Sequence, residues 1–129
     1  MASPEAWLRM AIEGVAGCNA YPLVVNEGQA PPFVVYMRTA TARVQQLDGA
    51  FDSPVGTFEI TIYNDGYLAV KTTADAVRAA VNNFQGPGEG ANILSVQLDN
   101  ERDADPVFLE GRDLPTFVVE QTYTIRWEE

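Results

Sequence analysis

The amino-acid sequence predicts an α+β fold: one domain, residues 1–129, with a single mostly antiparallel twisted sheet of four to five strands and two helices packed on one face. Three observations support this fold class. The stretch TFEITIY, residues 57–63, alternates polar and apolar side chains, as a half-buried strand does. Residues 70–84 place apolar side chains at steps of four and three, which is typical of one helix face. Two runs rich in β-branched and aromatic residues, 33–43 and 117–127, predict long strands.

The first element is a helix over residues 4–15. The letters SPE supply its start, with a serine N-cap, a proline at the first helical position and an acid near the positive end of the helix dipole. Leu8, Ile12 and Val15 then recur at helical spacing, and glycines bound the end. One face of this helix is therefore predicted to be apolar.

The second element is a short strand over residues 21–25, followed by a polar loop. The loop ends in two prolines, directly before the long strand of residues 33–43. Proline cannot donate a hydrogen bond to a sheet and is confined to strand starts, edges and bulges. Pro31 and Pro32 therefore mark the place where pairing of the long strand begins.

The alternating strand and the second helix follow. The strand turns its apolar residues to the core and its polar residues to water or to a partner, the latter being Thr57, Glu59 and Thr61. The helix face consists of Val70, Ala74, Val77, Val81 and Phe84. A glycine-rich loop, a strand over residues 94–98, an acidic loop and the final long strand complete the chain.

Composition narrows the classes of function. The chain has no histidine and one cysteine, Cys18, which removes the commonest general base, the commonest metal ligand and any intrachain disulfide. Its formal net charge of −10 disfavours gripping a nucleic-acid backbone. No apolar run is long enough to span a bilayer, and no secretion signal is present. We expect a protein made in a cytoplasm that is no enzyme and binds no membrane, metal or cofactor.

Two stretches approach known site patterns and are interpreted as loops. Acids in DNERDADPVFLE, residues 99–110, come close to calcium-loop spacing, but alanine stands where the sharp turn needs glycine. GPGEG follows a helix rather than a strand and lacks the lysine of a phosphate cradle. Neither stretch predicts a bound ion.

The order of elements resembles a known family. A helix precedes AYPL, a proline-led strand PPFVVY, an alternating strand FEITIY that ends in tyrosine, and an alanine- and valine-rich helix ADAVRAAVNNF. A strand running into an acidic loop and a last alternating strand follow. Over about residues 4–127 this order resembles the tail-completion, or tail-terminator, proteins of long-tailed phages and prophages. Tyr63-Asn64-Asp65 stands where that family has a more aromatic pair.

The resemblance implies a virion structural protein of the tail and neck without catalytic residues. Such proteins form a ring, commonly of six copies, on the last ring of the tail tube, stop its polymerisation and meet the head-side connector. DNA passes through the lumen without specific binding. We expect assembly or lumen contacts from the acids of the loops: Glu27, Asp48, Asp52, Glu89, Glu101, Asp103 and Asp105. The loops themselves span residues 26–32, 43–55, 85–91 and 100–114.

Two alternatives stay open. Within the phage class, the chain fits a head-tail connector or stopper protein of the neck. From a different class, a small cone-shaped α+β domain for ligand binding or isomerisation has a similar order of elements. That function needs a pocket, usually with a buried histidine or aspartate as base, and the chain has no histidine.

Overall fold

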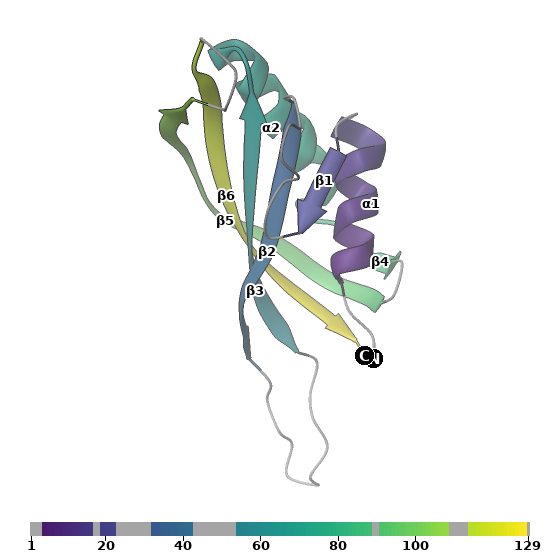
Figure 1. Ribbon diagram of the computed structural model, residues 1–129. Coiled ribbons are helices and arrows are strands. Elements are labelled where there is room, and N and C mark those ends of the chain that lie inside the picture. Colours follow the sequence, from purple (N-terminus) through teal and green to yellow (C-terminus); the bar gives the residue numbers. More distant parts are fainter. Residues whose placement is uncertain are drawn as a thin grey trace, which may run out of the picture.

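A computed structural model describes residues 4–16, 19–22, 32–42, 54–88, 91–108 and 114–128. Two helices and six strands follow one another along the chain (Figure 1). They are α1 (Glu5–Ala16), β1 (Asn19–Pro22), β2 (Phe33–Ala42), β3 (Val55–Asn64), α2 (Tyr67–Val81), β4 (Gly86–Gly88), β5 (Ala91–Val107) and β6 (Thr116–Glu128).

The sheet corrects the predicted fold class. Its strand order is β1-β2-β3-β6-β5-β4, so it has six strands rather than four to five. It is also mixed, because β1 runs parallel to β2 while the other neighbours are antiparallel. The sheet dominates the fold and curls into a half-barrel. The direction in which a short strand pairs is decided by distant parts of the chain, and the local sequence carries no signal for it.

The long elements lie where the sequence predicts them. Helix α1 is confirmed to within one residue at each end, and β3 contains the whole of residues 57–63. In α2, the residues predicted for the buried face include all four that are buried: Val70, Ala74, Val77 and Val81. Of the predicted strand 21–25, residues 21 and 22 belong to β1, and 23–25 lie outside the described residues.

The prediction of an acidic loop after residue 98 is wrong. Strand β5 continues to Val107 and pairs with β6 through Asn100, Glu101, Arg102, Asp103 and Ala104. Register shifts follow Leu98 and Ala104, so the strand accommodates its polar sequence with bulges. The predicted loop 85–91 likewise contains a short strand, β4.

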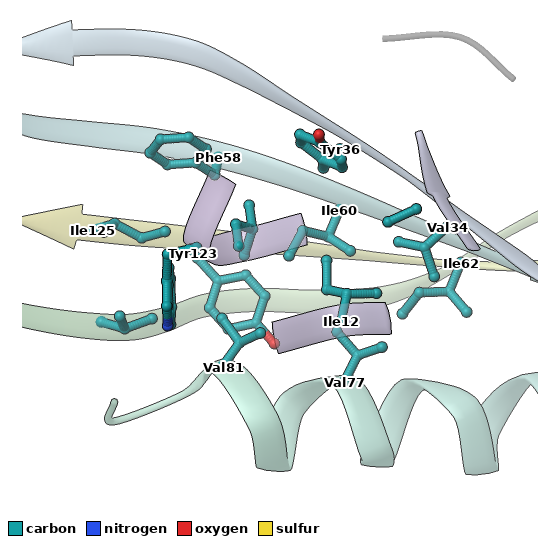
Figure 2. Packing of buried hydrophobic residues seen from close by; sticks show 14 of the residues in the cluster. Ile12, Val34, Tyr36, Phe58, Ile60, Ile62, Val77, Val81, Tyr123 and Ile125 are labelled. Carbon is teal, nitrogen blue, oxygen red and sulfur yellow. The ribbon is translucent and has the colours of Figure 1, made fainter. Parts of the chain in front are cut away.

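Both helices pack against one face of the sheet and share its core. Figure 2 shows Ile12 of α1 beside Val77 of α2, with Ile60 and Ile62 of β3 facing them. Tyr123 of β6 fills the space next to Val81 (Figure 2) and is fully buried. Alternate residues of β3 and β6 thus build the floor of the core, as the period of two along a strand requires.

The far end of the core is closed by aromatic rings and one cation. Trp127 is fully buried and meets Phe58 edge to face, with ring centroids 6.2 Å apart. The guanidinium of Arg38 lies 4.8 Å from the Trp127 ring centroid, within cation–π range. Arg38 also forms an ion pair with Glu5, so the start of α1 is tied to β2 at this end.

The rings of Phe58 and Trp127 fill the space beside the Cα atom of Gly56, and this packing predicts the effect of a larger residue there. A Cβ there would lie 2.8 Å from Cε1 of Phe58 and 3.0 Å from Cζ3 of Trp127. Gly56→Ala is therefore expected to lower the free energy of unfolding by about 1–3 kcal/mol, because the core is overpacked. Urea denaturation with a fluorescence readout measures the change.

Gly14 provides the matched control. It lies in α1, and a Cβ there would meet nothing within 4 Å. Gly14→Ala is expected to raise the free energy of unfolding by about 0.5–1 kcal/mol, because alanine loses less backbone entropy in a helix. Equal effects of the two substitutions would contradict the packing described at Gly56.

Candidate assembly surface

Three of the seven acids predicted to make assembly or lumen contacts belong to β5. Glu101, Asp103 and Asp105 lie on its second half. The other four, Glu27, Asp48, Asp52 and Glu89, lie outside the described residues. The predicted role can therefore be compared with structure only on β5.

Glu101 joins β5 to α2 and β6. It accepts hydrogen bonds from Nη1 of Arg78 at 3.1 Å and from Nε2 of Gln121 at 2.5 Å. Gln121 is fully buried, and its Nε2 also donates to the backbone oxygen of Ala74 at 3.0 Å. The hydroxyl of Tyr123 donates to Oε1 of Gln121 at 2.8 Å, and burial, with the charge of Glu101 adding to it, raises the pKa of Tyr123. This carboxylate therefore fastens a buried polar network between helix and sheet.

Asp103 is bound to the first turns of α2. It pairs with the ammonium of Lys71 and accepts a hydrogen bond from the Tyr67 hydroxyl at 2.9 Å. These two hydrogen bonds, that of Lys71 first, lower the pKa of the Asp103 carboxyl. Asp105 is exposed. Two of the three acids thus hold the subunit together, and a lumen role for any of them stays a prediction.

Most cations of the described residues are matched by acids of the same chain. Besides the pairs already given, Arg9 pairs with Glu13 across one turn of α1. Arg102 pairs with Glu120 on the neighbouring strand. Because these pairs neutralise the cations locally, the excess of ten negative charges is left to other acids.

The sheet face opposite the helices is polar along its middle. Neighbouring residues of β3 and β6 on this face are Thr57 with Thr124, Glu59 with Thr122, and Thr61 with Glu120. Thr57, Glu59 and Thr61 are half-buried on this face, as predicted. This face is available to water or to a partner.

An apolar groove lies at the other side of the molecule, where α1 meets the end of α2 and β4. Its volume is about 520 Å³. Trp7 and Phe84 form part of its wall, with ring centroids 4.8 Å apart, and Met10 is 59% exposed beside them. The full lining is Trp7, Met10, Ala11, Ala80, Phe84, Pro87 and Gly88.

A second exposed apolar region lies where β5 ends and β6 and α2 begin. Phe108, directly after β5, is 69% exposed, and Leu114, shortly before β6, is 75% exposed. Helix α2 begins at the same end of the molecule (Figure 1), and Leu68 in its first turn is 78% exposed. Large apolar side chains gathered in this way are typical of contact surfaces.

Two long strands keep parts of their outer edges open. Strand β1 pairs with residues 33–36 of β2 and leaves residues 37–42 without an outer strand among the described residues. Strand β4 pairs with residues 91–93 of β5. The predicted length of residues 33–43 indicated the long strand β2, but β5 was predicted as a strand over residues 94–98 only, so its open edge had no signal in the sequence.

Metal and membrane sites were also sought. Among the described residues, no group of three or more acids or cysteines is placed to hold a metal ion. Within the same parts of the chain, neither helix is long and apolar enough to cross a bilayer.

Comparisons with known proteins give a likeness of fold. No protein-family model matches the sequence. No curated protein matches it either. Among solved structures, 29 chains match. One belongs to a structure described as "Virion of native gene transfer agent (GTA) particle", with 18% identity and a TM-score of 0.72 over 99% of this chain and 96% of that chain. Another, whose description names no function, has 14% identity and a TM-score of 0.52 over 98% and 92% of the two chains.

The buried polar network yields a prediction for Glu101. Glu101→Ala removes a charged acceptor from Arg78 and Gln121 and is expected to lower the free energy of unfolding by about 2–3 kcal/mol. Asp105→Ala, on the same strand, is the control and is expected to stay within about 0.5 kcal/mol. Chemical denaturation measures the free energy of unfolding of both variants. An unchanged value for Glu101→Ala would contradict a stabilising role of Glu101 between helix and sheet.

The lowered pKa of Asp103 predicts a pH dependence. A carboxyl whose pKa is lower in the folded state stabilises the fold above its unfolded pKa, and this stabilisation is lost as the pH falls through the folded pKa. Asp103→Asn is therefore expected to flatten the fall in stability below about pH 4. Urea midpoints at pH 7 and pH 3 test this, with Asp105→Asn as the control.

Proposed function

We propose that this protein is a structural component of a phage-like particle and forms a ring at the head-proximal end of the tail tube. The ring stops polymerisation of the tube and joins the tail to the head-side connector. DNA passes through its lumen without specific binding, and no bond in a substrate is made or broken. The observation that carries this proposal is the end-to-end likeness of fold to a chain of a gene transfer agent virion.

The surface of the chain supports assembly. Open strand edges, an exposed apolar end and a polar sheet face are three kinds of contact surface on one small domain. Identical copies related by rotation use two different surfaces for each contact, and several such surfaces are available here. The net charge of −10 fits a lumen that does not hold DNA.

A connector or stopper of the neck is the second candidate within the same class. The description of the gene transfer agent structure names the whole particle, so the likeness does not distinguish this role from that of a terminator. The apolar groove favours a third candidate, ligand binding, because about 520 Å³ lies within the usual size of a ligand site. Its lining side chains are apolar apart from the indole N–H of Trp7, and none of them carries a charge that could orient a ligand.

Deletion of the gene from the phage or prophage that carries it separates the first two candidates. A terminator keeps the tube at a fixed length, so its loss is expected to give overlong tubes in electron micrographs of purified tails. A connector acts after the tube is complete, so its loss gives tails of normal length without heads. Resupplying the intact gene in trans is the control and restores complete particles.

A further inference from the structure

Backbone hydrogen-bonding groups on the outer edges of β2 and β5 have no strand beside them over long stretches. On β2 this stretch is residues 37–42, where all but Arg38 are exposed. On β5, Asn82 and Asn83 bind the backbone of Leu98 and Val96 just beyond β4. From residue 99 to residue 107, the described part of the chain places no strand on the outer side of β5.

An open edge is a template for another strand, and most proteins guard such edges with lysine, proline, charges or bulges. The β5 edge has these guards: it carries Pro106, two register shifts and four acids against one arginine, a net charge of −3 over residues 99–107. The β2 edge, MRTATA, carries neither proline nor lysine nor acid, and its guard is a register shift between Arg38 and Ala40. The β5 edge is therefore acidic, whereas the one charge of the β2 edge, Arg38, is neutralised by Glu5, so two β5 edges repel each other and a β2 edge does not repel a β5 edge.

We propose that the open edge of β2 in one copy pairs with the open edge of β5 in the next copy, so that the sheet continues from subunit to subunit around the ring. This inference rests on the proposed ring and assigns its subunit contact. Strand addition of this kind supplies affinity through main-chain hydrogen bonds.

Strand directions are compatible with this contact. From β2 to β3, β3 to β6 and β6 to β5 each pair is antiparallel, so β5 runs opposite to β2 within one subunit. Rotation about the ring axis keeps the direction of each strand along that axis. The β5 strand of the neighbour therefore runs antiparallel to β2, and lies end to end with β1 along the same edge.

The two open stretches also lie at different heights in the sheet. Through the paired residues, Asp103 of β5 is level with Val119, Ile62 and Val34. The middle of the open β2 stretch lies about five residues further along, which is an offset of about 17 Å at about 3.4 Å per residue. For the two open stretches to pair, neighbouring copies in the ring must compensate for this offset along the strands.

A tilt of the strands relative to the ring axis compensates for the offset. Four strands at about 4.8 Å spacing make each subunit about 19 Å wide, so strands tilted by about 42° place all copies at one height. Closed β-barrels have tilts of about 35–45°. The offset between the edges is thus compatible with a closed ring of sheets, in which six copies would measure about 49 Å across at the backbone.

A cysteine pair tests the contact directly. Ala40 and Ala104 face the side of the sheet away from the helices, and opposed antiparallel residues lie within disulfide range. Ala40→Cys with Ala104→Cys, in a Cys18→Ser background, is expected to give a ladder of linked copies that ends at the ring number. The ladder is read on non-reducing gels of purified protein and of tails under a mild oxidant. Ala40→Cys with Ala79→Cys on the exposed face of α2 is the control and gives no ladder.

A charge pair tests the same contact through the acids of β5. In the register of the cysteine test, residue 41 lies opposite Asp103, so Thr41→Glu is expected to lower ring yield at least tenfold, whereas Thr41→Lys keeps it. Negative-stain microscopy and light scattering count the rings. Rings that form without the cysteine link and with equal yield for both variants overturn the edge contact and leave the proposed function standing. A ladder of linked copies without an upper limit would support the contact between β2 and β5 but contradict a closed ring. Absence of any ring, in solution and on tails, would contradict both the edge contact and the proposed function.

Discussion

Every strand has hydrogen-bonding groups on two sides, and this sheet satisfies them unevenly. The central strands β3 and β6 are paired with each other over ten residues and with a second strand along most of their length. Their outer neighbours β2 and β5 are long, but the edge strands β1 and β4 have four and three residues. This mismatch between long and short strands determines both where the core closes and where the backbone stays open.

The two faces of the sheet differ in what covers them. On one face, α1 and α2 cover the central strands and complete the apolar core, with Gln121 as a fully buried polar residue held by Ala74, Glu101 and Tyr123. Beyond the helices, β2 and β3 continue as a ribbon (Figure 1). The other face carries threonines and acids, and neither of the two helices in the described part of the chain packs on it. A subunit built in this way is stable through one face and free to make contacts through the other face and the edges.

Sequence reasoning succeeded where local patterns decide the structure. Alternation in residues 57–63 and helical spacing from Val70 to Val81 reflect burial of one face, which each segment encodes by itself. It failed for residues 99–107, where charges and Pro106 suggest a loop. There the pairing with β6 overrides local preference, and Glu101 and Asp103 find cations on α2.

The candidate site was harder to predict for the same reason. A patch or an edge depends on which strands lie next to each other, and strand order is not a local property. The short pairing of β1 with β2 could not be foreseen from Asn19–Pro22, and among the described residues it decides which part of β2 stays open. The predicted length of residues 33–43 was an indirect sign of the β2 edge, whereas the strand predicted over 94–98 gave no sign of the β5 edge.

The negative net charge of the chain bears on how copies of it can contact one another. Local ion pairs neutralise the arginines and lysine of α1, α2 and β2, so the negative excess lies on the remaining acids. Contacts between two identical acidic edges are costly, which disfavours a closed dimer made through β5 and leaves contacts between unlike surfaces. Unlike surfaces joined head to tail are the ones that build rings. In the proposed ring, the charge that disfavours DNA binding therefore also favours contacts between unlike surfaces.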